Sequence, residues 1–230
     1  MTAVDLAQRL PDIATVRGLS QSFALLDAIL SPEGYATYAF DSRWGEDEEL
    51  ASMNNGSGDE YSIVFTTCGA FIRGFDHESP MSPYGDDDYA TWPGLVESVP
   101  WEFAAQVTEP AFCHDGGTGL FLAATVCLWR LHDDPAWKTG DIDFPRSGPA
   151  QDPDGSSWMF GLLAEGTPEA YCAYAAGYFE VTLDPADVRQ IFEQRPLTAD
   201  LVRRINTDAD LSALTGTLEA VGYPLAEARE

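Results

Sequence analysis

The spacing of apolar residues predicts helices at both ends of the chain and strands between them. Residues 19–30 place five apolar residues on one helical face: Leu19, Phe23, Leu26, Ile29 and Leu30. The segment Ser31-Pro32-Glu33-Gly34 ends this helix. Helical spacing returns after Pro168, over residues 170–178, 185–194, 198–205 and 208–221. Three of these helices have start signals at N-cap positions, namely Thr167, Asp184 and Thr198.

Alternating and continuous apolar runs predict strands over residues 35–40, 61–67, 70–75 and 120–131. Gly69 allows a tight reversal, so the second and third of these strands form a hairpin around Cys68-Gly69. A short helix follows Pro100, over residues 101–107. Exposed loops are expected over residues 46–58, 79–100 and 133–155, and the second of these contains four prolines.

This order of elements predicts an α+β fold: a central, mostly antiparallel sheet with an N-terminal helix and a C-terminal helical segment. The length suits one domain over residues 1–230. Within it, residues 35–165 form a strand-rich core with long acidic loops, and residues 167–222 form the helical part.

The chain carries 38 Asp and Glu against 12 Lys and Arg, a formal net charge of −26. A field of this sign repels nucleic acid and anionic membranes, and it attracts basic proteins. We therefore expect neither nucleic acid nor membrane as a partner. A high-GC genome or a salt-adapted host is an alternative origin of the same bias.

The sequence favours a cytoplasmic protein. The first ten residues lack the basic and apolar regions of a signal peptide, and the longest apolar run, residues 120–128, is too short to span a membrane. The four cysteines, Cys68, Cys113, Cys127 and Cys172, contain no C-x-x-C pair, which is evidence against a zinc knuckle or a redox motif.

Asp76-His77-Glu78 is the strongest candidate for chemistry, because it stands where a predicted strand enters a long loop. In extended chain Asp76 and Glu78 share one face and His77 the other, so one ion can bind all three only if the backbone turns there. His132 lies at the end of another predicted strand, and His114 precedes a third loop. If these ends converge, a zinc or manganese site with the ligands Asp76, His77, His114 and His132 results.

Two other interpretations of these residues stay open. In a purely structural one, Asp76 caps a turn, His77 bonds a backbone carbonyl and Glu78 pairs with Arg73 or lies in solvent. In the other, the same groups form a hydrogen-bonding pocket for a polar ligand.

Acidic and aromatic residues together suit the binding of an arginine-rich protein. Carboxylates gather at Glu46, Asp47, Glu48 and Glu49 and again at Asp86, Asp87 and Asp88, with Tyr84, Tyr89 and Trp92 as aromatic anchors. These ten residues form the expected partner-binding surface.

One resemblance covers most of the chain, about residues 35–224. The run from Phe71 to Tyr84, Val99-Pro100, the strand end Cys127-Leu128-Trp129-Arg130, Asp154-Gly155-Ser156 and Gly222-Tyr223-Pro224 resemble a family of uncharacterised bacterial α+β proteins. The resemblance implies no particular reaction. Small acidic proteins of this general type are often immunity partners of bacterial toxins, an analogy of class and not of residues.

Two functional hypotheses follow, besides that of a structural domain whose charge reflects only its genome. The first is a non-catalytic binding protein, without a cofactor, that masks a basic partner such as a toxin in the manner of an immunity protein. The second is a hydrolase that depends on one divalent transition metal, in which Glu78 acts as general base.

Overall fold

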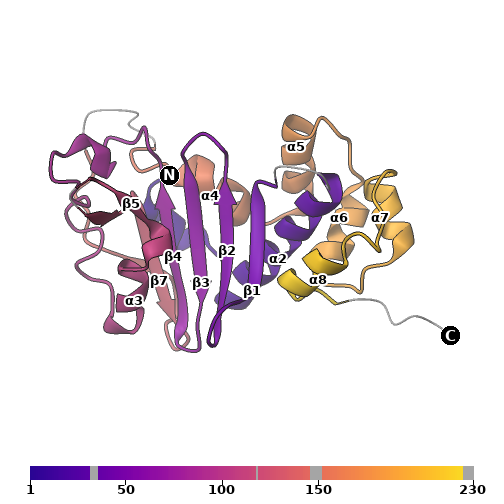
Figure 1. Ribbon diagram of the computed structural model, residues 1–230, viewed down its shortest axis with the longest axis horizontal. Coiled ribbons are helices and arrows are strands. Elements are labelled where there is room, and N and C mark those ends of the chain that lie inside the picture. The colour runs from indigo at the N-terminus through magenta and orange to yellow at the C-terminus, as the bar shows by residue number, and fades with distance from the viewer. Residues whose placement is uncertain (32–35, 118, 146–151, 225–230) are drawn as a thin grey trace.

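The computed structural model describes residues 1–31, 36–117, 119–145 and 152–224. Its centre is a six-stranded sheet with the strand order β1-β2-β3-β4-β7-β8, and every neighbouring pair is antiparallel (Figure 1). A small second sheet pairs β5 with β6. The predicted α+β class, with its mostly antiparallel sheet, is confirmed.

The strands are β1 (Tyr38–Gly45), β2 (Glu48–Asn54), β3 (Glu60–Phe65), β4 (Gly69–Phe75), β5 (Cys113–Asp115), β6 (Leu120–Leu122), β7 (Val126–Leu131) and β8 (Lys138–Thr139). The α-helices are α1 (Ala3–Arg9), α2 (Ile13–Leu30), α3 (Ala104–Val107), α4 (Ser156–Glu165), α5 (Pro168–Tyr178), α6 (Pro185–Phe192), α7 (Ala199–Ile205) and α8 (Thr215–Val221). Three 3-10 turns are η1 (Pro83–Gly85), η2 (Trp101–Phe103) and η3 (Pro110–Phe112).

Both faces of the central strands are covered. Helices α1, α2 and α4 pack on one face, where Ile63 and Ile72 belong to the main core (Figure 1). On the other face, Phe71 and Trp129 pack under irregular chain that we call the loop layer (residues 79–117 and 119–125). Strand β4 is consequently buried along its whole length, since successive side chains alternate between two cores.

One buried cation ties the loop layer to the sheet. The Arg73 side chain, only 1% exposed, donates to Glu60 Oε1 over 2.7 Å and to the carbonyl oxygens of Ala123 and Phe112 over 2.6 and 3.4 Å. Its guanidinium carbon also lies 6.0 Å from the centre of the Phe75 ring. A buried charge is tolerated when it is paired and hydrogen-bonded in this way.

Several predicted elements are confirmed and others are wrong. The hairpin around Cys68-Gly69 forms as β3 and β4, and Thr167, Asp184 and Thr198 cap their helices through their side chains. The predicted loop over residues 46–58 contains strand β2. This strand begins with two acidic residues, but Ala51 and Met53 farther along it are buried. The predicted loop over residues 133–155 contains the short strand β8, and the predicted helix over residues 208–221 is helical only from Thr215, as α8. The predicted strand over residues 120–131 is divided into β6 and β7.

The division of that strand has a hydrogen-bonding reason. Between β6 and β7 the chain leaves the small sheet, and its Ala123 carbonyl turns to the Arg73 guanidinium. The sequence does not predict helices α1 and α4. Of the predicted helix end, Ser31 is described, and residues 32–34 lie outside the described residues. Tyr35, the expected start of the next strand, also lies outside them.

By length and composition, α2 is apolar enough to cross a membrane, and it is the one such helix among the described residues. However, 61% of it is buried inside the protein, and it contacts β1, β2 and the C-terminal helices. Its apolar character therefore has an explanation as the central helix of the core.

A buried carboxylate fixes α2 to the edge strand β1. Asp27 is fully buried, and it accepts hydrogen bonds from the Thr37 and Tyr38 backbone N–H groups and from the Tyr171 hydroxyl, over 2.9, 3.0 and 2.7 Å. Burial raises the pKa of Asp27 to about 6, although these three hydrogen bonds oppose the shift.

Replacement of Asp27 tests this anchor. Because the folded-state pKa lies above the ordinary value of 3.8, this group's contribution to stability is greatest below about pH 3.8 and falls by about 3 kcal/mol as the pH rises through 6. Asp27→Asn keeps an acceptor for both N–H groups and a donor for Tyr171, so its stability relative to wild type should increase between pH 4.5 and 7 in urea unfolding.

Asp27→Ala is the matched contrast, since it leaves all three donors unpaired. We expect it to be less stable than Asp27→Asn by at least about 3 kcal/mol at either pH. An Asn variant whose stability runs parallel to that of wild type across this pH range would show that Asp27 does not titrate as a buried acid.

Candidate functional site

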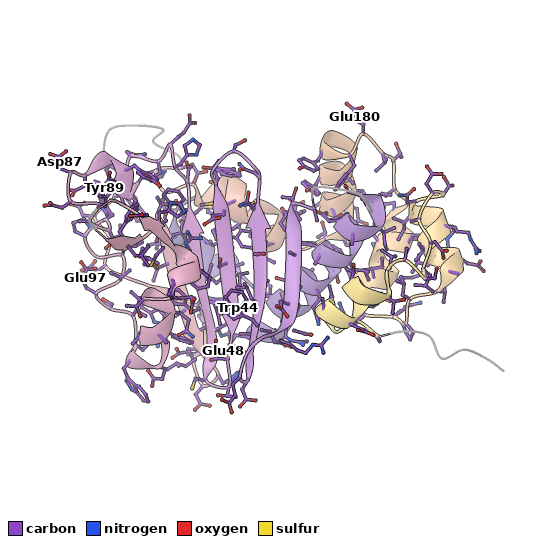
Figure 2. All side chains as sticks on the ribbon, in the orientation of Figure 1. Trp44, Glu48, Asp87, Tyr89, Glu97 and Glu180 are labelled. Atoms are coloured by element: carbon purple, nitrogen blue, oxygen red, sulfur yellow. The ribbon has the colours of Figure 1, made fainter. Side chains whose placement is uncertain are left out.

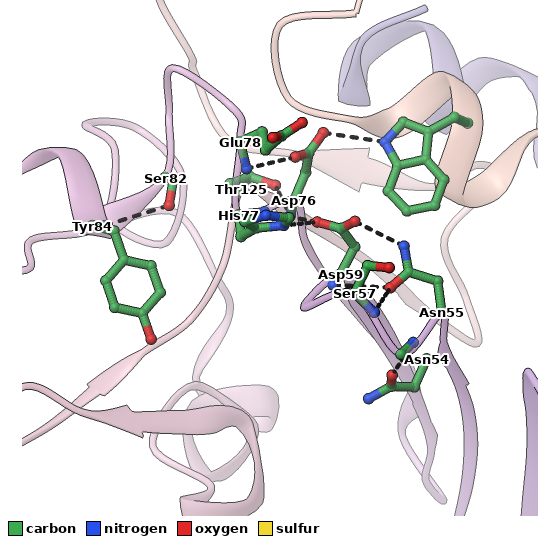
Figure 3. A network of polar contacts seen from close by, with 12 residues as sticks. Asn54, Asn55, Ser57, Asp59, Asp76, His77, Glu78, Ser82, Tyr84 and Thr125 are labelled. Atoms are coloured by element: carbon green, nitrogen blue, oxygen red, sulfur yellow. Dashed lines mark hydrogen bonds and ion pairs between the residues drawn. The ribbon is translucent and has the colours of Figure 1, made fainter. Parts of the chain in front are cut away.

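A turn directly after β4 joins His77 to the start of β3. Strand β4 ends at Phe75, and the Ser79 N–H donates to the Asp76 carbonyl. The backbone therefore turns directly after β4, which a shared ion site at Asp76 and His77 requires (Figure 3). The His77 ring nitrogen Nδ1 lies 2.6 Å from Asp59 Oδ1, and the His77 backbone N–H donates to the same oxygen over 2.9 Å. The carboxylate therefore holds both the ring and the turn.

Asp59 is a largely buried acid that the fold keeps ionised. Its residue is 8% exposed, and its second oxygen accepts from Asn55 Nδ2 over 2.8 Å. Burial favours the neutral form, but the hydrogen bonds from the His77 ring, the His77 backbone and Asn55 outweigh it, so the pKa of Asp59 is lowered. The hydrogen bond to Asp59 in turn raises the pKa of His77.

Asp76 faces the helix side of the sheet. Its Oδ1 accepts from the Glu78 backbone N–H over 3.0 Å, which is a turn cap, and its Oδ2 accepts from Trp158 Nε1 over 3.1 Å. Gly155, with φ +79°, lies so close that an added Cβ would be 2.6 Å from the Asp76 Cβ. The loop before α4 thus closes directly over this carboxylate.

Asp59, Asp76 and His77 form one cluster of possible metal ligands. Each offers a ligand atom, and these atoms all lie within 4.8 Å of one another. The cluster borders an open cavity of about 420 Å³, whose lining residues are Asp59, Asp76, Glu78, Ser79, Asp152 and Trp158. Glu78 is exposed and lines the cavity. The ion pair between Glu78 and Arg73 that the structural interpretation allowed does not form, because Arg73 pairs with Glu60.

The three histidines do not converge. His132 follows β7 at the opposite end of β4, where its N–H donates to the Cys68 carbonyl. His114 lies in strand β5 of the loop layer, with Nδ1 2.9 Å from the Tyr84 hydroxyl and Nε2 3.8 Å from Glu60 Oε1. Of the four expected ligands, the structure brings together Asp76 and His77, and it adds Asp59.

The acidic loop combines with aromatic rings at the same end of the sheet. Asp86, Asp87 and Asp88 are exposed, and the Tyr84 side chain beside them is 51% exposed (Figure 2). Tyr89 stacks on Phe121 with ring centres 4.7 Å apart, and Tyr84 meets both rings edge-on. We call Tyr84, Asp86, Asp87, Asp88 and Tyr89 the acidic loop patch.

The second predicted acidic group lies elsewhere. Glu48 begins β2 at the opposite end of the sheet from Asp87, as Figure 2 shows, and Glu46 and Asp47 are in the turn before it. Glu48 accepts from Gln106 Nε2, and Glu49 is paired with Arg17. The expected ten-residue surface is therefore not continuous.

Trp92, the third predicted aromatic anchor, is not part of the acidic loop patch and is hydrogen-bonded to a different segment. Its Nε1 donates to the Asp143 carbonyl over 3.1 Å, and the residue is half-buried. The ring therefore has a structural role in fixing the loop layer.

Charge is distributed unevenly over the molecule. Residues 44–129 contain fifteen Asp and Glu but a single Lys or Arg, which is the buried Arg73. The helical part, residues 167–222, contains nine acids and four arginines, and each arginine pairs with a carboxylate. The sheet and loop layer thus present acids to solvent with no exposed Lys or Arg between residues 44 and 129.

No protein-family model, curated protein or solved structure matches the chain. The resemblance of the Phe71–Tyr84 region to a bacterial family stays a prediction.

Asp59 is the site residue that sequence reasoning missed. The observed hairpin pairs Phe65 with Ala70 and Glu60 with Phe75, which places Asp59 opposite Asp76. The predicted arms, residues 61–67 and 70–75, pair residue 67 with residue 70 and so do not bring Asp59 to this position. The residues before Asp59 are acidic and rich in glycine, so the sequence predicts a loop over residues 46–58 and gives no reason to expect strand pairing next to Asp59.

The pair of His77 and Asp59 predicts a pH-dependent contribution to stability. His77 has a raised folded-state pKa, so its contribution is fully present below about pH 6.5 and is lost as the pH rises through the folded-state value. The difference in melting temperature between wild type and His77→Gln should therefore be larger at pH 6 than at pH 9. His132→Gln, the same substitution outside the pair, is the control.

An equal difference at both values of pH would mean that the ring contributes packing alone. The melting temperatures are compared at fixed ionic strength, because salt screens the repulsion between the many surface carboxylates of this protein.

Proposed function

We propose that this protein is a non-catalytic binding protein that masks a basic partner through the acidic loop patch. The observation that supports the proposal is the uneven charge: fifteen acids in residues 44–129, with their one cation buried. A genomic or halophilic bias acts on the whole chain, and it gives no reason for eleven of the twelve Lys and Arg residues to lie outside residues 44–129. A localised field is what steers a partner of opposite charge.

The acidic loop patch has the composition of a protein interface as well as its charge. Tyr84 offers a half-exposed ring held from behind by Phe75, His114 and Phe121, so little side-chain entropy is lost when a partner covers it. Tyrosine beside carboxylates recognises arginine well, because the guanidinium stacks on the ring and pairs with the acid.

The kind of partner follows from this chemistry. A protein whose own activity needs a basic surface, such as a toxin that acts on nucleic acid, is blocked when that surface is covered. We therefore propose an immunity-type inhibitor that works in the cytoplasm. A reducing compartment suits the cysteines, since all four are free thiols.

A defined cationic probe tests the proposal. We expect fluorescein-labelled deca-arginine to bind, with affinity at least tenfold weaker at 300 mM than at 50 mM salt, as measured by fluorescence anisotropy. In Asp86→Asn/Asp87→Asn/Asp88→Asn the association rate should fall several-fold, because three exposed charges leave the patch. The substitution at position 86 retains a side-chain oxygen that can cap the N–H of residue 88, so the loop should keep its shape.

The control variant removes the same charge from the helical part: Glu180→Gln/Asp208→Asn/Glu219→Gln, all exposed. It should bind within about twofold of wild type. Equal losses in the two variants would show that net charge and not the acidic loop patch attracts the probe, and affinity independent of salt would refute the electrostatic basis altogether.

A further inference from the structure

The cluster of Asp59, Asp76 and His77 lies outside the acidic loop patch, and masking a basic partner makes no use of it. We propose that it is a binding site for one divalent transition metal ion. The proposal is independent of the proposed function, because Asp59 and Asp76 line the cavity beside α4 and the His77 ligand atom lies within 4.8 Å of theirs.

The donor set decides the class of ion. One imidazole nitrogen and two carboxylate oxygens suit zinc or manganese, whereas calcium and magnesium prefer sites made of oxygen alone. Around the cavity, within the part of the chain that the structure describes, two further acids, Glu78 and Asp152, are lining residues, and no Lys or Arg is. The electrostatic environment therefore favours a cation, and nothing in the lining competes for it.

The distances fit after a small movement. Two atoms bound to one tetrahedral zinc ion lie about 3.3 Å apart, and bonds to nitrogen and oxygen are about 2.0–2.2 Å. His77 Nδ1 and Asp59 Oδ1 are 2.6 Å apart and hydrogen-bonded, and the ligand atoms of all three residues lie within 4.8 Å of one another. On binding, the proton leaves Nδ1 for solvent and the ion takes its place between ring and carboxylate.

The surrounding structure holds two donors and leaves the third free to adjust. Asp59 is fixed by Asn55 and by the His77 backbone, and Asp76 is enclosed by Gly155 and bonded by Trp158. The His77 side chain, 39% exposed, packs beside Gly58, whose added Cβ would lie 3.5 Å from the ring. Bound carboxylates need such second partners to keep their orientation.

Zinc titration of the full chain tests the site, in 150 mM salt with excess Mg²⁺ to occupy unspecific carboxylates. We expect about one zinc equivalent by equilibrium dialysis, and at least a tenfold loss of affinity in His77→Gln. His132→Gln, a histidine at the opposite end of the sheet, should bind as wild type does.

A spectroscopic signal reports the position of the ion. Trp158 Nε1 donates to Asp76 Oδ2, so zinc bound to this carboxylate changes the charge beside the indole. Tryptophan fluorescence should therefore change on zinc binding in wild type and not in Trp158→Phe, which still binds zinc. Asp76→Asn is the second ligand variant, because it leaves the His77–Asp59 pair intact should His77→Gln fail to fold. Zinc binding that Mg²⁺ displaces, or that survives unchanged in both ligand variants, would overturn the proposal.

Discussion

The ion pair between the buried Arg73 and the partly exposed Glu60 is the interaction on which the rest of this structure depends. It joins β4 to β3, and through the Ala123 and Phe112 carbonyls it joins both strands to the loop layer. A buried guanidinium without these partners would cost several kcal/mol, so the loop layer is held in place by the need to satisfy it. The same burial removes the one cation of residues 44–129 from the surface.

The two candidate sites are consequences of this arrangement at one end of the sheet. Because the strand before it is locked into two cores, the turn at His77 has a fixed starting point, and Asp59 on the paired strand completes it. On the loop-layer side, Phe75 and His114 support the exposed ring of Tyr84. Residues at the end of β4 and directly after it therefore contribute to both sites: Phe75 packs against Tyr84 of the acidic loop patch, and Asp76 and His77 belong to the cluster with Asp59.

The opposite end of the sheet has a different character. There Glu49 pairs with Arg17 of α2 and Glu48 bonds Gln106, so acids that look alike in the sequence are partly used inside the fold. An acidic run is therefore informative about binding only when its charges lack internal partners. The helical part shows the same mixing of signs through Arg189, Arg203 and Arg204.

The sequence by itself determined the elements whose signals are local. Apolar spacing gave α2, the turn at Cys68-Gly69 gave the hairpin, and the caps at Thr167, Asp184 and Thr198 gave three helix starts, because side-chain periodicity and capping act within a few residues. Strand β2 escaped because its stability comes from its two neighbours and not from its acidic composition. Only the tertiary structure decided that His132 lies far from His77 and that Asp59 lies beside it, since strand register and burial, not proximity in sequence, bring side chains together.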